Sequence, residues 1–322
     1  MAPKNEAKNN ATFTLAFAGD IRWESVLRQR LDDPESALEP IRSELAAADL
    51  TVVNLETAIT TRGEPEDKEF TFRAPPAAFE ALAAAGVDVA SMGNNHGVDF
   101  GTDGLSDTLA AINDAPLAVV GIGQDAAQAF GPHVVRIKGT SVAVIGATQV
   151  NDPTSRNFPA GEGRAGVASA VDPQRLIAAV RQARRTSDVV VVYLHWGEEL
   201  NQCPTNKQED LARRLADAGA DVVIGTHAHM LLGAGWLGRT YVGYGLGNFV
   251  WPNQTTTTTS TTGVLTLTMK GRRVTAARWS PAMIRSNGLP HFADGDKAEE
   301  MRKDFADLRS CTDLAAAPAP PE

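Results

Sequence analysis

Two histidines separated by one residue, His227 and His229, follow a short apolar run in the segment 221–229. Residues 222–224 predict a buried strand, and Gly225 marks the turn at its end. Neutral imidazole is a good ligand for borderline divalent ions. The chain holds only six histidines, so two of them at this place favour a metal site over a chance pair in a loop.

Potential metal ligands also follow four other predicted strands, at the point where each strand ends. They are Asp20, Glu56, the pair Asn95 and His96, and His195. Because the carboxyl ends of parallel strands lie along one edge of a sheet, these side chains can converge. Carboxylates, imidazoles and an amide suit two divalent ions, and the lack of cysteine argues against a structural zinc site.

Each of these residues alone also has a structural explanation. Asp20 can cap a helix, Glu56 can lie on the surface, Asn95 can adopt left-handed turn geometry, and His195 can be a buried core histidine. Five strand ends with the same pattern make the metal site the stronger hypothesis.

The elements that must position these residues alternate between strand and helix. This order predicts an α/β fold in which helices cover a predominantly parallel or mixed sheet. Two late hairpins are expected at 133–147 and 264–279. The expected strands span 12–18, 50–53, 87–92, 117–120, 188–194 and 222–224, and the expected helices span 36–48, 77–85, 102–113, 172–185, 206–218 and 297–309.

Composition and the chain ends narrow the possible partners. A net charge of −9 argues against a nucleic-acid or anionic-membrane partner. No apolar run reaches the ~20 residues that span a bilayer, and the first ten residues lack the apolar core of a secretion signal. We therefore expect no direct membrane insertion and a cytoplasmic location. Cys203 and Cys311 are expected to be free thiols, which fits a reducing compartment.

One domain is expected at 12–310, between disordered tails at 1–11 and 311–322. The threonine-rich run 255–262 predicts a surface loop.

The motifs at the strand ends, taken in order, resemble the CapA family. These are bacterial proteins linked to poly-γ-glutamate capsule synthesis, and they are similar to calcineurin-like metallophosphoesterases. The likeness covers roughly residues 13–284. The motifs are Gly19-Asp20, Asn54-Leu-Glu56, Asn94-Asn-His96, His195-Trp-Gly197, Gly225-x-His-x-His229 and Leu246-Gly-Asn-Phe249.

The resemblance implies a four-layer αββα sandwich with a dinuclear site at one edge. Asp20 and His229 would hold the first metal, and Asn95, His195 and His227 would hold the second. One or two divalent ions are expected, with Mn²⁺, Zn²⁺, Fe²⁺ and Mg²⁺ all open.

Glu56 would take the bridging place between the two metals. His96 would stand beside them, either as a general acid for the leaving group or to polarise the attacked group. Asp99 would orient His96, and helix capping is the alternative role for Asp99.

Two departures from the metallophosphoesterase pattern affect the chemistry. Arg22 stands where a histidine usually follows the first aspartate, so the first metal loses a neutral ligand and a single-metal site becomes possible. Glu56 replaces the usual bridging aspartate, as is typical of CapA-like chains.

Arg73 is the candidate anion clamp, because a guanidinium binds carboxylate or phosphate through two parallel hydrogen bonds. A structural ion pair is the alternative for Arg73. Asn248, Trp196 and Glu198 are expected to line the pocket and contact the substrate.

These features predict a metal-dependent hydrolase that acts on an anionic small molecule or polymer through metal-activated water. The substrate would be a γ-glutamyl amide, giving hydrolysis or transfer, or a phosphoester. The alternative is a non-catalytic component of a poly-γ-glutamate or capsule biosynthesis complex that binds metal or polymer. The lack of an apparent membrane anchor favours a free-standing enzyme, and the oligomeric state stays open.

Overall fold

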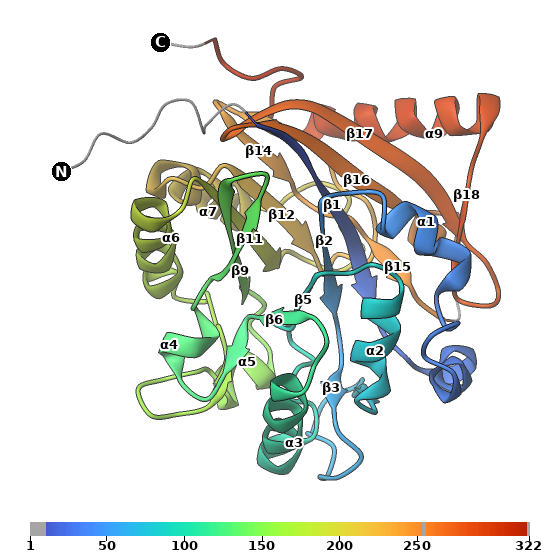
Figure 1. The fold of residues 1–322 in the computed structure, drawn as a ribbon, viewed down its shortest axis with the longest axis vertical. Coiled ribbons are helices and arrows are strands. Elements are labelled where there is room, and N and C mark those ends of the chain that lie inside the picture. Colours follow the sequence, from blue (N-terminus) through green and yellow to red (C-terminus); the bar gives the residue numbers. More distant parts are fainter. Residues whose placement is uncertain (1–10, 253–255, 321–322) are drawn as a thin grey trace.

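The computed structural model describes residues 11–252 and 256–320, which form two facing sheets with helices on both outer sides (Figure 1). The predicted N-terminal tail 1–11 lies outside the described residues except for residue 11.

The first sheet has eight strands and contains the N-terminal strand at its centre. Strands β1, β2, β5 and β6 run parallel to one another, β15 pairs in parallel with β1, and β16 to β18 continue the sheet antiparallel. The order is β18 (Pro290–Phe292), β17 (Arg273–Ile284), β16 (Thr261–Lys270), β1 (Thr12–Ile21), β2 (Leu50–Leu55), β5 (Val89–Ser91) and β6 (Ala118–Val120), with β15 (Asn248–Val250) beside β1.

The second sheet has six strands, and its four inner strands are parallel. The edge strands pair antiparallel through hairpins. The order is β13 (Ala234–Leu237), β14 (Thr240–Gly243), β12 (Val222–Thr226), β11 (Val189–His195), β9 (Thr140–Thr148) and β8 (His133–Ile137). Two small sheets pair β3 (Ala58–Ile59) with β4 (Arg73–Ala74) and β7 (Ile122–Gly123) with β10 (Gly166–Val167).

The alternation of side chains along the strands builds the layers. In β1, Phe13, Leu15 and Phe17 point into the core between the two sheets, whereas Ala16 and Ala18 point to the helices outside. Strand β11 is apolar on both faces, as expected for a central parallel strand that is covered on both sides. The two sheets therefore share one inner core, and each has a second core under its helices.

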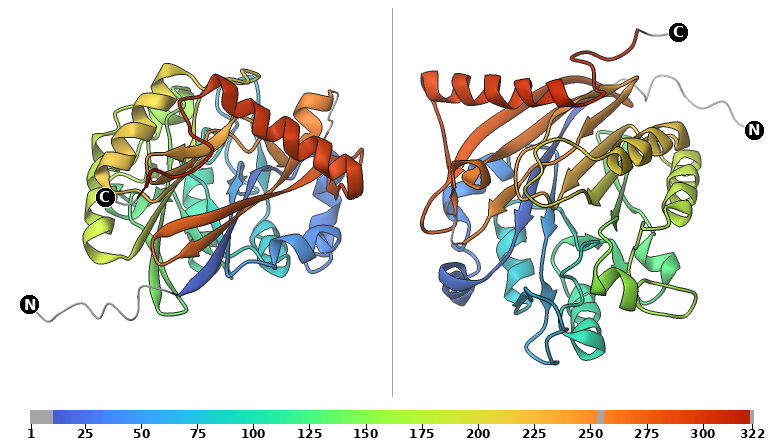
Figure 2. Two further views of the ribbon diagram at one scale, coloured as in Figure 1. Left: turned by 90° about the horizontal axis from the view of Figure 1, so that it is seen from above. Right: turned by 180° about the vertical axis from the view of Figure 1, so that it is seen from behind.

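Helices cover the outer face of each sheet, which completes the four-layer αββα sandwich predicted from the resemblance (Figures 1 and 2). The first sheet carries η2 (Ser25–Asp32), η3 (Glu39–Ile41), α1 (Arg42–Leu45), α2 (Ala77–Ala84) and α3 (Gly101–Asn113). The second carries α4 (Ala126–Ala129), α6 (Gln174–Thr186) and α7 (Asn206–Ala218).

Four further short or terminal helices complete the described chain. Helix α9 packs on β17, where the Phe305 and Trp279 rings stack with centroids 4.5 Å apart. These four are α5 (Pro153–Asn157), α8 (Thr257–Ser260), α9 (Gly295–Asp307) and η4 (Leu308–Cys311).

Two local expectations differ from the structure. The predicted helix 36–48 is broken into turns, η3 and α1, because Pro40 lacks the backbone N–H that a continuous helix needs. In the threonine-rich run, residue 255 lies outside the described residues, the next ones form α8, and β16 begins at Thr261.

The C-terminal segment is docked rather than disordered over its described residues. Ala315 and Trp236 exchange backbone hydrogen bonds of 2.8 and 2.9 Å, and Ala319 donates to the Gly238 carbonyl at 2.8 Å. Leu314 is buried in the core under α7. The alanine- and proline-rich composition suggested a free tail, but backbone pairing with β13 and one leucine anchor it.

The prediction of two free thiols is wrong, because Cys203 and Cys311 form a disulfide. The two residues are 108 positions apart in sequence, and their Cα atoms are 5.7 Å apart. Two cysteines this distant in sequence carry no local signal that they meet. The expectation of a reducing compartment loses its support, since that setting keeps thiols reduced.

Among the described residues, no helix combines the length and apolar character that crossing a bilayer requires.

Candidate metal centre

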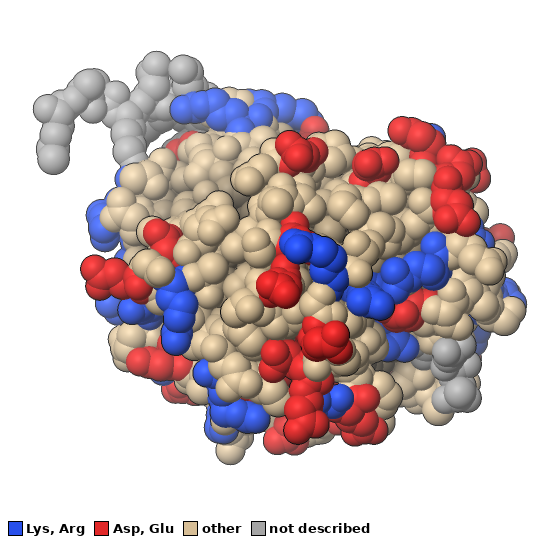
Figure 3. Space-filling model, turned by 90° about the horizontal axis from the view of Figure 1, so that it is seen from below, with Lys and Arg blue, Asp and Glu red and all other residues tan. Residues whose placement is uncertain are grey.

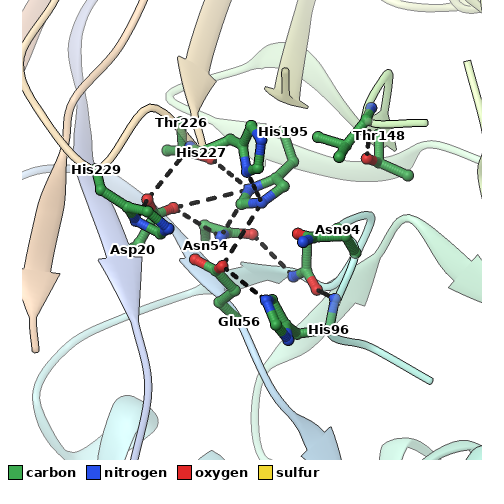
Figure 4. A network of polar contacts seen from close by, with 12 residues as sticks. Asp20, Asn54, Glu56, Asn94, His96, Thr148, His195, Thr226, His227 and His229 are labelled. Atoms are coloured by element: carbon green, nitrogen blue, oxygen red, sulfur yellow. Dashed lines mark hydrogen bonds and ion pairs between the residues drawn. The ribbon is translucent and has the colours of Figure 1, made fainter. Parts of the chain in front are cut away.

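The carboxyl ends of strands from both sheets meet at one edge of the sandwich, and the predicted ligands gather there (Figure 4). Possible ligand atoms of Asp20, Glu56 and His195 all lie within 4.8 Å of one another, and all three residues are buried. Those of His227, His229 and Glu199 form a second such group. Convergence of the strand ends, which the sequence predicts, is therefore what the fold produces.

Asp20 reaches this edge because the residue before it, Gly19, has no side chain to obstruct the close approach of another segment. A Cβ on Gly19 would lie 1.8 Å from the Gly247 carbonyl oxygen. The close approach lets the Asp20 N–H donate to that oxygen at 2.9 Å, which ties the end of β1 to the turn before β15. Only glycine at position 19 permits this register.

His227 and His229 both have a left-handed backbone, with φ of 89° and 56°. Non-glycine residues are sterically disfavoured in this region, and such strain gathers at functional sites. The two unusual φ values turn both imidazoles back towards the end of β1 after β12 ends (Figure 4).

Asp20 is held by three contacts and is fully buried. Its Oδ1 accepts from Asn54 Nδ2 at 2.8 Å, and its Oδ2 accepts from the His227 N–H at 3.2 Å. His229 Nδ1 lies 3.4 Å from Oδ2. The carboxylate is thus oriented from β2 and from the loop after β12, beside one predicted ligand.

Glu56 is the most telling residue of the site. It is fully buried, and neither carboxylate oxygen has a hydrogen-bond partner among the described residues. Burial, and then the nearby Asp20 carboxylate, raise the pKa of Glu56 well above its ordinary value. Asn95 Oδ1 is likewise buried and accepts no hydrogen bond from any residue that the structure describes. Unpaired buried acceptors are costly, and divalent cations are the partners that such oxygen atoms fit.

The imidazoles of His195 and His227 are suited to ligation. Nε2 of His195 lies 3.1 Å from Nδ1 of His227 and 3.7 Å from Glu56 Oε1. Burial lowers the pKa of His195 well below its ordinary value and lowers the pKa of His227 to about 3. Both rings are therefore neutral at pH 7, which is the form that binds metals.

His96 stands beside this set, linked to a buried carboxylate. Its Nε2 lies 3.6 Å from Glu56 Oε1, and its Nδ1 lies 2.6 Å from Asp99 Oδ2. Asp99 also accepts from Lys68 Nζ at 2.9 Å and from the Phe72 N–H at 2.7 Å. Burial raises the pKa of Asp99 to about 7.

The alternative role for Asp99, capping the next helix, is not seen. The N-cap residue of α3 is Phe100, and the cap has no side-chain hydrogen bond. Asp99 instead orients the His96 ring.

Several residues that position the site were not singled out from the sequence. Asn54 Nδ2 lies 3.2 Å from His195 Nδ1, besides its bond to Asp20. Asn94 Nδ2 donates to Asn54 Oδ1 at 3.0 Å, and Asn94 Oδ1 accepts from the His96 N–H at 3.0 Å. Thr226 Oγ1 lies 3.0 Å from His195 Nδ1. Both asparagines lie inside the motifs Asn54-Leu-Glu56 and Asn94-Asn-His96, so an amide at a strand end is the sequence signal for this positioning role.

Trp196 and Asn248, which were expected to line the pocket, make other contacts in the structure. Trp196 is fully buried under α7, where its Nε1 donates to the Tyr244 carbonyl at 2.8 Å, so it cannot line a substrate pocket. Its apolar ring simply continues the core face of β11. Asn248 is 2% exposed, and its amide is used by His229 Nδ1 at 2.9 Å and by two carbonyls at 3.2 Å each.

The other two are Glu198 and Arg73. Glu198 is exposed and contacts Asn201 Nδ2 at 3.4 Å, whereas its neighbour Glu199 belongs to the group with His227 and His229. The Arg73 guanidinium lies 4.6 Å from the centroid of the Phe100 ring and forms no ion pair with the described residues, so the alternative of a structural ion pair is not seen and the anion clamp stays a prediction.

Arg22 occupies the position where the metallophosphoesterase pattern has a histidine. Its guanidinium lies over the rings of Phe72 and Trp251, at 4.3 and 4.1 Å from their centroids. A guanidinium stays protonated and cannot ligate a metal.

On the outer face seen from the side of the strand ends, acidic and basic residues are interspersed (Figure 3).

Comparison with known proteins identifies relatives over most of the chain. A family model described as "Bacterial capsule synthesis protein PGA_cap" matches residues 14–253. The PGA biosynthesis protein CapA of Bacillus subtilis (strain 168) is 31% identical over 256 residues, which are 77% of this chain and 66% of the relative. The capsule biosynthesis protein CapA of Bacillus anthracis is 28% identical over 253 residues, which are 76% of this chain and 61% of the relative. The chain thus spans less than two thirds of these relatives' lengths.

Solved structures support the fold. A novel phosphatase from Mycoplasma pneumoniae superposes with a TM-score of 0.51 at 14% identity, covering 90% of this chain and 97% of that chain. A hypothetical protein from Thermus thermophilus gives a TM-score of 0.51 at 16% identity, covering 84% of this chain and 99% of that chain. At such identities the likeness concerns the fold alone.

Proposed function

Because the chain belongs to the family of bacterial capsule synthesis proteins, we propose that it is a divalent-metal-dependent hydrolase acting on an anionic substrate. The observation that carries this proposal is Glu56, a buried carboxylate whose two oxygens have no hydrogen-bond partner among the described residues. Such a carboxylate, beside a second carboxylate and three imidazoles, makes a donor set that suits divalent cations.

We assign the ligands as the resemblance implies, and two short contacts support the pairing. Asp20 and His229 adjoin each other at 3.4 Å and would hold one ion. His195 and His227, which adjoin at 3.1 Å, would hold the other together with Asn95. Glu56 would lie between the two ions.

Contacts on the far side of the histidines would fix their orientation. Asn248 bonds His229 Nδ1 and leaves Nε2 for a ligand, and Thr226 contacts His195 Nδ1. Metal-bound histidines are usually oriented in this way by a second hydrogen bond.

When bound, divalent ions would supply positive charge and a water molecule of lowered pKa. The protein's own residues do the rest. Asp99 fixes the His96 ring so that Nε2 faces the site. Burial lowers the pKa of His96, so the ring is neutral; when Asp99, with its pKa of about 7, is protonated and donates to Nδ1, the ring proton lies on Nε2 and can pass to the leaving group. Lys68 holds Asp99 in place by its bond at 2.9 Å and also donates to the Asn95 carbonyl at 2.6 Å.

Two substrate classes suit this arrangement, and both carry oxyanions. A γ-glutamyl amide, cleaved by hydrolysis or transfer, agrees with the names of the capsule-related relatives. A phosphoester agrees with the fold shared with a phosphatase. In both, His96 would protonate the leaving nitrogen or oxygen.

Reconstitution of the purified protein tests the proposal. The chelator-treated protein is loaded with Mn²⁺, Zn²⁺, Fe²⁺ or Mg²⁺ and assayed on p-nitrophenyl phosphomonoesters and diesters and on γ-glutamyl peptides, with His195→Ala and Glu56→Ala alongside. We expect turnover that depends on metal and that both substitutions abolish together with metal content. Stoichiometric metal without turnover on any of these substrates would favour a non-catalytic, metal- or polymer-binding role in capsule synthesis. Absence of bound metal would contradict the hydrolase and leave only a polymer-binding role.

A further inference from the structure

Arg22 lies in a corner formed by two aromatic rings. Phe72 and Trp251 meet edge to face, with centroids 6.1 Å apart and planes at 85°. The guanidinium carbon lies 4.3 Å from the first centroid and 4.1 Å from the second. Its backbone N–H donates to the Val250 carbonyl at 3.1 Å, so β15 fixes the start of the side chain. Two aromatic rings and one backbone hydrogen bond therefore position the Arg22 guanidinium.

Both rings that hold Arg22 also hold a histidine of the site. The Phe72 ring stacks on the His96 ring, with centroids 4.1 Å apart and planes at 27°. The Trp251 ring packs against the His229 ring, with centroids 4.6 Å apart. Arg22 is thus connected on one side to the proposed general acid and on the other to a proposed ligand.

Within residues 11–252 and 256–320, no acidic side chain is bonded to the Arg22 guanidinium. Among the described residues it forms no hydrogen bond or ion pair, and its Nε is buried without a partner. Glu56 attracts it electrostatically, although burial is the larger influence and lowers the pKa of Arg22. Cations that proteins bury are normally paired, so the donors of Arg22 are available to a group that the chain does not supply.

We propose that Arg22 binds an oxyanion of the substrate, a carboxylate or a phosphate, at the edge of the metal centre. This inference rests on the proposed hydrolase function and gives that site its anion-recognising residue. A histidine at this position would add a neutral metal ligand, whereas arginine offers two parallel N–H donors at a fixed place. At position 22 this chain therefore has a residue that contacts the substrate in place of a metal ligand.

Arg73 is the rival residue for this role, and the structure distinguishes the two. The Arg73 guanidinium lies over Phe100, the residue that begins the turn into α3. Among the described residues, the Phe100 ring that Arg73 contacts does not pack against a histidine of the site. Both rings around Arg22 do, because Phe72 packs on His96 and Trp251 packs on His229.

Anion titration tests the inference separately from turnover. Inorganic phosphate and L-glutamate are titrated by calorimetry into the Mn²⁺-loaded wild type and into Arg22→Gln, Arg22→Lys and Arg73→Gln. Arg273→Gln is the matched control, because Arg273 is exposed and lies far from the site. It pairs with Lys270, which pairs with Thr12 at the start of β1, whereas Asp20 lies near the other end of that strand. Thermal unfolding confirms that each variant is folded.

We expect the wild type to bind one of the two anions and Arg22→Gln to bind it roughly ten- to one-hundred-fold more weakly, since the lost hydrogen bonds are charge-assisted. Arg22→Lys keeps the charge but not the paired donors and should be intermediate, which preserves the test if the glutamine variant fails to fold. Mn²⁺ affinity should stay the same or increase. The anion that binds identifies the substrate class.

Three results would overturn the inference: wild type that binds neither anion, Arg22→Gln with wild-type affinity, or a loss confined to Arg73→Gln. Anion binding that needs Arg22, without turnover on any substrate, would instead leave the inference standing and refute the hydrolase function.

Discussion

Nδ1 of His227 lies 3.1 Å from Nε2 of His195, although the two rings come from adjacent strand ends 32 positions apart in sequence. The ring centroids are 4.6 Å apart, and both residues are buried. Burial holds the pKa of each ring low, so no positive charge on either ring balances Asp20 and Glu56 at neutral pH. In the metal-free site these two buried acidic groups therefore receive no compensating charge from His195 or His227, and burial raises the pKa of Glu56.

Substitution of Glu56 by glutamine should stabilise the metal-free protein while it abolishes metal binding. The buried carboxylate has no hydrogen-bond partner among the described residues, so its removal should raise the free energy of unfolding at pH 8 by on the order of 2 kcal/mol. Added metal at about 100 times its dissociation constant should stabilise the wild type by about 2.7 kcal/mol and leave Glu56→Gln unchanged. Urea unfolding with and without chelator measures both.

The stabilisation by Glu56→Gln should grow with pH. Burial raises the pKa of Glu56 above its ordinary value of 4.5, so the folded protein binds this proton more tightly than the unfolded chain. The wild-type free energy of unfolding then falls as pH rises from 4.5 to the folded pKa, and the penalty is fully present above it. The histidines contribute equally to both proteins. A difference between the two proteins that is the same at pH 5 and pH 8 would contradict this explanation.

Substitution of His96 by asparagine should lower kcat by roughly 10²- to 10⁴-fold, the usual contribution of a general acid, without loss of metal. Asp99→Asn keeps the ring contact but weakens the orientation, so a smaller loss in kcat with unchanged KM is expected. Elemental analysis of the same samples separates this result from His195→Ala, in which metal should be lost. Reduced metal content in His96→Asn would place His96 among the ligands instead.

Asn248→Ala should weaken metal binding by roughly 10- to 100-fold, because Asn248 orients His229 through the contact at 2.9 Å. KM measured at saturating metal should not change. Asn113→Ala, at the exposed end of α3, serves as the control for loss of an amide. If KM rises while metal affinity is retained, Asn248 contacts the substrate as the sequence suggested.

Reduction of the Cys203–Cys311 disulfide should lower the free energy of unfolding by roughly 2–5 kcal/mol. Thermal unfolding with and without reductant measures the loss, and Cys311→Ser should unfold like the reduced protein and ignore reductant. Thiol titration of the unfolded protein before reduction should find no free cysteine. Two reactive thiols at that stage would show that the bond is absent in solution.

Much of this site could be predicted because its residues follow strands that the apolar pattern makes visible. Residues 222–224 and the run before His195 are β-branched and short, and parallel strands must end at one edge. For the same reason Asp20 and Glu56, which each follow a predicted strand, are expected to lie close together. Local sequence is sufficient when the chemistry is attached directly to the end of a strand.

The residues that were misplaced depend on contacts that no local pattern encodes. Trp196 follows His195, yet the alternation along β11 turns it into the outer core. Glu198 and Glu199 are adjacent acids in one loop, and only the tertiary fold shows that Glu199 is the one near His227. The partner of Cys203 lies more than a hundred positions away. In each case the direction of a side chain was decided by distant parts of the chain.

The left-handed backbone at His227 and His229 has a consequence for directed evolution. Glycine adopts this conformation without the steric penalty that histidine carries, so His227→Gly and His229→Gly relieve strain. A library selected for heat resistance in the absence of metal should therefore enrich glycine at both positions and return stable proteins that lack the two imidazoles. Selection must include metal retention if the evolved variants are to keep the site.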